Sequence, residues 1–245
     1  MIETFVIHLE RATARRPHVD SMLMKSPQPA QIWPACDGAA MEAGARDKLV
    51  SQSPLLTPAY PFKLSMGEIG CFESHRSVWR HMVKNKIAAA LILEDDVAID
   101  PPVFDAAVDL AVKHVSSLGY IQLQVREVKP PFQVIEQSGA TAILRPQVTP
   151  LRTSAQVVSL EAARALLTAS DQIDRPVDTF LQMFWDTTVR VHCVAPSGVS
   201  DLTAEAGGST VSRKRSLWQK VVAEAKRWTY RSQIAALSKQ RGGGA

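Results

Sequence analysis

The chain has 245 residues, 46% of them hydrophobic and 21% charged, which is an ordinary composition for a folded globular protein. No apolar run approaches the roughly 18 residues that a membrane-spanning helix needs, and acidic Glu3 interrupts the apolar N-terminus, so we expect neither a transmembrane helix nor a signal peptide. The three cysteines are widely spaced and have no zinc-finger or redox-motif pattern, which favours reduced thiols in a cytoplasm.

The net charge of +4 hides a division of the chain into two parts. Residues 212–245 contain nine Lys and Arg against one acid, Glu224, so they carry +8, whereas residues 1–211 carry −4. Gly207-Gly208 marks the change in composition. We therefore predict a folded domain over residues 1–207 and a basic, helical, partly disordered tail over residues 208–245.

Strands and helices are expected to alternate along the folded part. The predicted strands are 4–9, 31–35, 88–93, 119–124, 156–160 and 189–194, with a hairpin at 132–135 and 142–144. The predicted helices are one that contains Val19 and Leu23, then 39–50, 65–84, 102–117, 161–169 and 177–185. Ser65 and Glu68 have the spacing of a capping box. Such alternation is typical of an α/β sandwich with a mostly parallel sheet.

The apolar run at 88–93 ends in three consecutive acids, Glu94, Asp95 and Asp96. An uninterrupted apolar run is typical of a strand inside a parallel sheet, and ligands of open α/β sheets bind beyond the carboxyl ends of the strands. Three neighbouring carboxylates repel one another, and Mg²⁺ or Mn²⁺ would offset that charge with the oxygen ligands that such ions prefer. The alternative is a solvated acidic turn.

Several motifs occur together in one order. They are Phe5-Val6-Ile7-His8-Leu9-Glu10-Arg11 with Arg15-Arg16, then Ala35-Cys36-Asp37-Gly38, Leu64-Ser65-Met66-Gly67-Glu68-Ile69-Gly70-Cys71-Phe72-Glu73-Ser74-His75 and Ile92-Leu93-Glu94-Asp95-Asp96-Val97. In this order and spacing they resemble glycosyltransferase family 25, whose bacterial members include lipopolysaccharide and lipooligosaccharide galactosyltransferases. The resemblance covers about residues 2–200. The family usually has Asn at the position of His8.

The resemblance implies a GT-A-type fold, a UDP-sugar donor, commonly UDP-galactose, and a divalent metal, Mn²⁺ or Mg²⁺. By position, the three acids form the motif that holds the metal against the donor diphosphate. Asp96 is then the first candidate ligand and Glu94 the second, while Asp95 could instead bind the ribose or the sugar of the donor. A further ligand would come from late in the domain, where His192 and Asp201 are both available.

Four other residues are expected to bind the donor: Arg11, Asp37, Ser74 and His75. Arg11 follows the first strand, where a diphosphate could lie, and arginine suits bidentate contacts to phosphate. Arg15 and Arg16 are weaker candidates for the same role. Asp37 follows the second strand in a turn sequence and would bind the base or the ribose. Ser74 and His75 lie on the helix that precedes the acidic strand, where a structural role is the alternative.

An inverting transferase needs a carboxylate that takes the proton from the acceptor hydroxyl. Asp178, in Arg175-Pro176-Val177-Asp178, resembles the family's Pro-x-Asp element on the acceptor side, so it is the predicted catalytic base. Asp174 and Asp186 are the alternatives. An acid that merely stabilises a helix N-terminus would also explain Asp178.

The tail from Arg213 to Ser238 is predicted to form a basic amphipathic helix with Leu217, Val221, Ala225 and Trp228 on one stripe. Such a helix suits an anionic membrane surface, where a lipid-anchored acceptor would give it a role. A helix packed on the folded domain and a solvated tail are the alternatives. No nucleic-acid-binding module accompanies the positive charge, so we do not expect nucleic acid as a partner.

The sequence therefore predicts a metal-dependent, inverting glycosyltransferase that moves a hexose, galactose first, from a UDP-sugar to a glycan or lipid-linked saccharide acceptor of the lipopolysaccharide type. We expect it in the cytoplasm, peripherally at the inner face of the inner membrane. A non-catalytic, membrane-associated member that binds nucleotide sugars is the alternative. A phospho-acceptor receiver domain fits less well, because its acid pair follows the first strand rather than the third.

Overall fold

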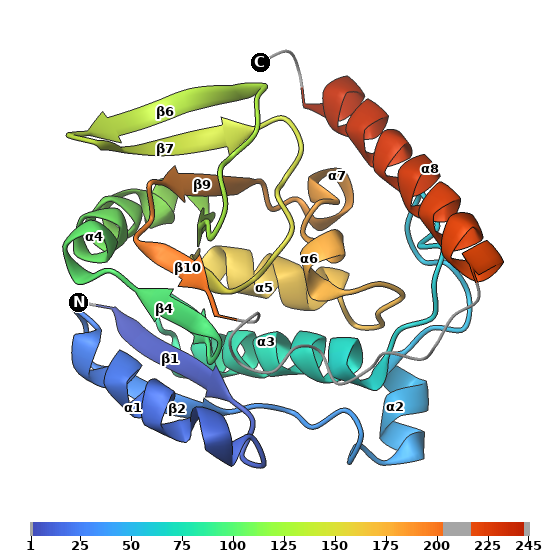
Figure 1. Ribbon diagram of the computed structural model, residues 1–245, viewed down its shortest axis with the longest axis horizontal. Coiled ribbons are helices and arrows are strands. Elements are labelled where there is room, and N and C mark those ends of the chain that lie inside the picture. The colour runs from blue at the N-terminus through green and yellow to red at the C-terminus, as the bar shows by residue number, and fades with distance from the viewer. Residues whose placement is uncertain (1, 203–216, 243–245) are drawn as a thin grey trace.

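The computed structural model describes residues 2–202 and 217–242 (Figure 1). The strands are β1 (Glu3–His8), β2 (Ala30–Pro34), β3 (Ala89–Glu94), β4 (Val97–Ile99), β5 (Tyr120–Leu123), β6 (Phe132–Ser138), β7 (Thr141–Pro146), β8 (Ala155–Ser159), β9 (Val191–Ala195) and β10 (Val199–Asp201). The helices are α1 (Arg16–Lys25), α2 (Ala43–Leu49), α3 (Met66–Asn85), α4 (Pro101–Leu118), α5 (Leu160–Ala169), α6 (Val177–Phe180), α7 (Phe184–Thr187) and α8 (Leu217–Arg241), with a 3₁₀ turn at Thr13–Arg15.

Eight strands form one sheet in the order β2-β1-β3-β8-β5-β9-β7-β6. β1 pairs in parallel with β2 and β3, and β5 pairs in parallel with β9. β8 lies between β3 and β5 and runs antiparallel to both, and β7 runs antiparallel to β9 and β6. The other six strands therefore point the same way. The carboxyl ends of β1, β2 and β3 meet at one edge of the sheet, where the site is expected.

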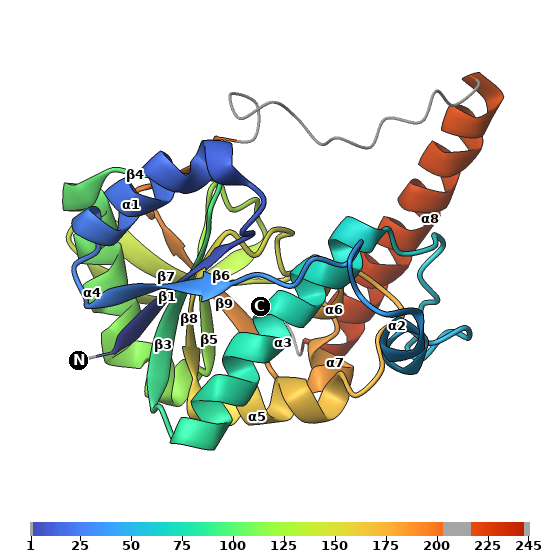
Figure 2. The same ribbon diagram turned by 90° about the horizontal axis from the view of Figure 1, so that it is seen from below.

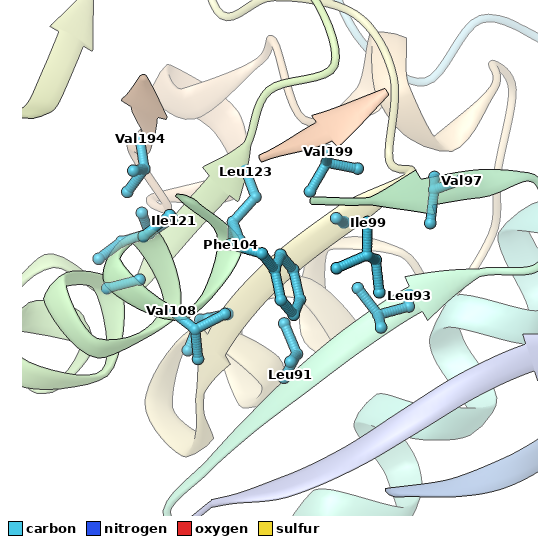
Figure 3. Packing of buried hydrophobic residues seen from close by; sticks show 14 of the residues in the cluster. Leu91, Leu93, Val97, Ile99, Phe104, Val108, Ile121, Leu123, Val194 and Val199 are labelled. Atoms are coloured by element: carbon cyan, nitrogen blue, oxygen red, sulfur yellow. The ribbon is translucent and has the colours of Figure 1, made fainter. Parts of the chain in front are cut away.

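Two apolar cores lie on the two faces of the sheet, and alternate residues of β3 belong to each. Leu91 and Leu93 pack in the core that includes α1 and α4, whereas Ala90 and Ile92 pack in the core that includes α3 and α5. Figure 2 shows the two helix layers on either side of the sheet. Figure 3 shows Phe104 of α4 pointing into the first core from its helix. The predicted α/β sandwich is confirmed.

Helix α3 begins with the predicted capping box, in which Ser65 accepts from Glu68 N and Glu68 accepts from Ser65 N at 2.7 Å. The loop that contains Gly38 packs directly on the first turns of this helix. A Cβ at Gly38 would lie 1.9 Å from Met66 O, and one at Gly70 would lie 2.5 Å from Cys36 O. Both glycines therefore allow a backbone-to-backbone contact that any side chain would prevent.

Several boundaries differ from the predicted ones. The predicted helix at 39–50 begins only at Ala43, and the one at 177–185 is divided into α6 and α7. β4 and β10 were not predicted, because each has three residues and is stabilised by its pairing with the other rather than by a local pattern. This two-stranded sheet follows the acid motif directly.

Helix α8 packs on the domain through a different stripe from the predicted one. Tyr230 and Ile234 are 6% and 2% exposed and pack with Met183. Val221 and Trp228 of the predicted stripe are 59% and 71% exposed. The predicted boundary at residue 207 lies outside the described residues, so the division into two parts stays a prediction. Among the helices in the described ranges, none combines the length and apolar character needed to cross a membrane.

Candidate active site

Glu94 is the last residue of β3, and two other segments hold its carboxylate. His75 Nε2 lies 3.0 Å from Glu94 Oε1, and the Thr153 hydroxyl donates to the same oxygen at 2.7 Å. The Gln156 side-chain nitrogen lies 3.3 Å from His75 Nδ1, which favours a proton on Nε2 that is donated to Glu94. Burial raises the pKa of Glu94, but these two hydrogen bonds and the charges of His75 and Arg152 together outweigh burial, and the pKa is lowered. Glu94 is thus held ionised.

Asp95 is buried and is bound by two basic side chains. His8 Nδ1 lies 2.7 Å from one carboxylate oxygen, and Arg15 Nη1 donates to the other at 2.6 Å. His8 comes from the end of β1 and Arg15 from the turn after it, so Asp95 connects β3 to the N-terminal segment. The predicted contact of Asp95 with the ribose or sugar of the UDP-sugar would be made from this fixed position, and that contact stays a prediction.

Asp96 connects β3 to β4, and the pairing of β4 with β10 brings Asp201 next to it. Asp201 is in register with Val97, and Leu202 N donates to Asp96 O at 2.9 Å. Burial and the charges of Glu94, Asp95 and Asp201 raise the pKa of Asp96 to about 6, against the opposing effect of Arg15. The structure therefore brings together carboxylates from the two ends of the domain.

His192 was the alternative to Asp201, and the structure separates the two. His192 is buried in β9, three strands from β3 in the sheet. Burial and the charges of Arg145 and Arg190 lower its pKa to about 4. Of the two candidates for a further ligand, Asp201 is the one beside the acid motif.

Arg152 is a site residue that the sequence analysis did not single out. Its guanidinium lies 2.8 Å from the Asp201 carboxylate, and its backbone N–H donates to Asp178 at 3.4 Å. Its φ of 95° is sparsely populated for a residue other than glycine, and such strain often marks functional sites. Its carbonyl accepts from the Gln122 side chain at 2.9 Å, which holds this conformation. No local pattern in the sequence predicts a positive φ at an arginine.

A cavity of about 980 Å³ opens beside Glu94, and Asp178 and Arg152 line it. Asp178 lies in the first turn of α6, where Thr179 N donates to its carboxylate at 2.7 Å. Burial and the nearby charge of Glu94 raise the pKa of Asp178, and the hydrogen bonds from Thr179 and Arg152 reduce that effect without reversing it. Asp178 therefore lies at the cavity with a raised pKa, and its role as the catalytic base stays a prediction.

The two alternatives to Asp178 lie in other surroundings. Asp174 accepts from Arg175 Nε at 2.7 Å and Nη2 at 2.9 Å, and from Leu55 N at 2.8 Å. Asp186 is exposed in α7. Among these three acids in the described chain, Asp178 is the one that lines the cavity.

Arg11 and Asp37 form an exposed ion pair just beyond the ends of β1 and β2, with Arg11 Nε 2.5 Å from the carboxylate. Both therefore lie at the edge of the sheet where a nucleotide is expected. Ser74 is buried and its hydroxyl accepts from Cys36 N at 2.8 Å and donates to Gly70 O at 2.7 Å. This contact joins α3 to the loop of Asp37. Arg16 lies apart from the site, paired with Asp20. The donor roles stay predictions.

Cys71, His75 and Glu94 form a second group whose ligand atoms lie within 4.8 Å of one another. Burial and the charge of Glu94 raise the pKa of the Cys71 thiol well above its ordinary value. Hydrogen bonds to Glu94 account for the grouping, and we assign it no metal.

A large, mostly parallel sheet between two helix layers, with an acidic motif at the end of a central strand beside a cavity, places the protein in the class of α/β sandwich proteins whose site lies at the carboxyl ends of the strands. The chain belongs to glycosyltransferase family 25: the family model described as "Glycosyltransferase family 25 (LPS biosynthesis protein)" matches residues 1–181. This confirms the resemblance seen in the sequence.

Relatives from animals match about three quarters of the chain. The Drosophila melanogaster "Glycosyltransferase 25 family member" is 28% identical over 191 residues, 74% of this chain and 30% of the relative. The mouse "Inactive glycosyltransferase 25 family member 3" is 32% identical over 195 residues, 75% and 32%. Human "Procollagen galactosyltransferase 2" is 28% identical over 193 residues, 75% and 30%. The matched region spans about a third of each relative's length.

Proposed function

We propose that this protein is a metal-dependent glycosyltransferase that moves a hexose, galactose first, from a UDP-sugar to a glycan acceptor of the lipopolysaccharide or lipooligosaccharide type, with inversion. The arrangement of the acids carries the proposal. Asp96 lies beside Asp201 at the carboxyl end of β3, and Glu94 of the same strand end lines one cavity with Asp178. An acid cluster for a metal-bound diphosphate next to a cavity with a base suits this reaction.

The donor atoms fit a hard divalent cation such as Mn²⁺ or Mg²⁺. Asp96 and Asp201 offer carboxylate oxygens from neighbouring strand ends, and these ions prefer oxygen ligands. Oε1 of Glu94, the second predicted ligand, already accepts hydrogen bonds from His75 and Thr153. A cation held by Asp96 and Asp201 would supply Lewis-acid stabilisation of the charge on the leaving diphosphate.

Residues of this chain would bind the substrates and move the proton. Asp178 takes the proton of the acceptor hydroxyl, because it lines the cavity and its raised pKa brings it nearer to the operating pH. Arg15 and Arg152 place positive charge around the acid cluster, where a diphosphate would lie. Arg11 and Asp37 would contact the nucleotide beyond the ends of β1 and β2.

The relatives support both this proposal and its alternative. One relative is named a galactosyltransferase, which favours galactose as the transferred sugar. Others are named inactive, so a member that binds a nucleotide sugar without transferring it is the alternative function. The three acids at the end of β3 and Asp178 beside the cavity favour catalysis in this chain.

The test is a thermal-shift screen of the full chain against UDP-, GDP- and CMP-sugars, with and without Mn²⁺, followed by a transfer assay. A UDP-sugar should raise the melting temperature only with the metal, and Asp96→Asn should remove that rise. Asp100→Asn, an exposed acid after β4, is the matched control and should retain it. Transfer that EDTA leaves undiminished would overturn the metal-dependent mechanism, and UDP-sugar binding without transfer would establish the alternative.

We also propose peripheral contact with an anionic membrane at the cytoplasmic face of the inner membrane. Val221, Val222 and Trp228 are exposed on α8, and Lys220 and Lys226 lie on the same helix. An apolar strip with neighbouring cations is the pattern of a helix that lies in a membrane interface. Such contact would bring the cavity close to a lipid-linked saccharide.

A further inference from the structure

Helix α8 supplies one wall of the cavity, although it lies beyond residues 1–181 that the family model matches. Its cavity-lining residues are Arg227, Tyr230, Arg231 and Ile234. Asp178 and Glu94 line the same cavity from the family domain. Because α8 lies outside the part of the chain that the family model matches, its residues can give this chain an acceptor preference of its own.

The wall is fixed to the domain by polar and aromatic contacts. The hydroxyl of Tyr230 accepts a hydrogen bond from Arg175 Nη1 at 3.0 Å, and Arg175 is completely buried. Arg175 also donates to the carbonyls of Leu56 and Pro58 at 2.9 and 3.1 Å, so one side chain connects α8 to the loop at 51–63. The ring of Tyr60 meets that of Tyr230 edge to face, with centroids 5.5 Å apart. The position of α8 beside the cavity is therefore built into the fold.

The wall is basic and aromatic. Arg227 lies over the ring of Phe62, 5.4 Å from its centroid, and Arg231 is one helical turn further along. Arg126 and Lys129, from the segment between β5 and β6, line the same cavity. The lining also contains four acids, Glu68, Glu94, Glu127 and Asp178. Glu224 of α8 accepts from Arg227 at 3.0 Å and lies 4.0 Å from Arg231, so an anionic group that binds the two arginines would take the place of Glu224 as their counter-charge.

We propose that α8 is the acceptor-recognition wall of this enzyme and that the acceptor saccharide carries a negative group, a phosphate or a carboxylate. Arg227 and Arg231 bind that group, while the hydroxyl that receives the hexose reaches Asp178. Arginine suits this task because its planar fork makes paired, charge-assisted hydrogen bonds to either group. Phe62 and Tyr60 offer aromatic faces on which a sugar ring packs. The inference rests on the proposed function and specifies its acceptor half.

The test uses the full chain and two pairs of substitutions on α8 that remove the same charge. Arg227→Gln with Arg231→Gln changes the cavity wall, whereas Lys239→Gln with Arg241→Gln changes exposed residues outside the cavity lining. The probes are glucose 6-phosphate, galactose 6-phosphate and glucuronate, compared with glucose and galactose at constant ionic strength. The charged sugars should raise the melting temperature of the wild-type chain and of the Lys239/Arg241 variant. The affinity of the Arg227/Arg231 variant for them should fall at least about tenfold.

UDP with Mn²⁺ serves as the separate donor arm. Both variants should keep the wild-type response to it, because neither pair lies in the acid cluster. If the wild-type chain does not bind UDP at all, the proposed function fails. If UDP binds but no charged sugar does, or the response to charged sugars survives in the Arg227/Arg231 variant, the acceptor inference is overturned. A loss confined to the binding of anionic vesicles would assign the two arginines to lipid headgroups and would also overturn it.

Discussion

His75 holds the carboxylate of Glu94 from within α3, with Nε2 3.0 Å from Oε1. The contact joins two motifs, because His75 ends the Gly-Glu-Ile-Gly-Cys block and Glu94 begins the Glu-Asp-Asp block. The two blocks therefore form one unit in the structure. The contact between His8 and Asp95 similarly gives a structural role to the residue at which this chain departs from the usual Asn of the family.

Replacement of His75 tests whether it positions Glu94. His75→Ala leaves a largely buried carboxylate with one fewer donor, so the free energy of unfolding should fall by about 1–3 kcal/mol. The pKa of Glu94 should rise, and the acid limb of the pH–activity profile should move to higher pH. His75→Gln, whose amide can donate in place of Nε2, should restore part of both effects. An unchanged pH profile in the Ala variant would limit His75 to packing.

Asp178→Asn should separate stability from activity. The folded pKa of Asp178 is raised, so its contribution to stability is complete below the unfolded pKa of about 3.9 and declines as pH rises through the folded pKa. At neutral pH the neutral Asn should therefore give an equal or higher melting temperature. Transfer should fall by at least about 100-fold if Asp178 is the base. Thermal unfolding and initial rates on one preparation check both, and a rate near the wild type would exclude Asp178 as the base.

Three glycine-to-alanine substitutions test the packing of the Asp37 loop on α3. Gly38→Ala and Gly70→Ala place a Cβ against a backbone oxygen, at 1.9 and 2.5 Å, and should each destabilise the protein by about 1–3 kcal/mol or more. Gly67→Ala meets nothing within 4 Å and should be neutral or stabilising by up to about 1 kcal/mol, because alanine is the better helix former. Urea unfolding of the three variants checks the order, and equal stability would contradict the close approach.

Asp174 should stabilise the protein in a pH-dependent way. Burial raises the pKa of this carboxyl, but the hydrogen bonds from Arg175 and Leu55 outweigh burial, so the folded pKa lies below the unfolded value. Its stabilisation is therefore present above about pH 3.9 and is lost as pH falls through the folded pKa. Asp174→Asn leaves buried Arg175 without its counter-charge and should cost about 3–5 kcal/mol at pH 7. Denaturant unfolding should show the difference from wild type shrinking in acid, and a difference that is constant with pH would argue against ionisation as its cause.

Membrane contact through α8 can be tested by co-sedimentation with vesicles. The protein should bind vesicles that contain phosphatidylglycerol and bind neutral vesicles weakly, with loss of binding at high salt. Trp228→Ser should weaken binding about tenfold, since it removes a large exposed apolar side chain from the contact. Met24→Ser, at an 81% exposed apolar position on α1, is the control and should bind as wild type. Equal binding by the Trp228 variant would refute contact through this face.

Local sequence patterns were sufficient for much of the fold. The buried run of β3 and the capping box of α3 depend on neighbouring residues, so their predictions are confirmed to within a residue or two. The division of 177–185 into two helices and the pairing of β4 with β10 depend on distant contacts, and the sequence analysis missed both. On α8 the sequence analysis singled out the stripe that contains Val221 and Trp228, which are exposed, whereas the stripe that contains Tyr230 and Ile234 packs on the domain.

The sequence by itself determined the family and the α/β alternation, and it placed three acids at the end of a central strand, because motifs and periodicity are properties of neighbouring residues. Only the tertiary structure decided which atoms meet. It brought Asp201 rather than His192 beside Asp96 and placed His75 against Glu94. It also gave Arg152 its positive φ and made α8 one wall of the cavity. These contacts join segments far apart in the chain, and their geometry follows from how the sheet and the two helix layers pack, which no local pattern encodes.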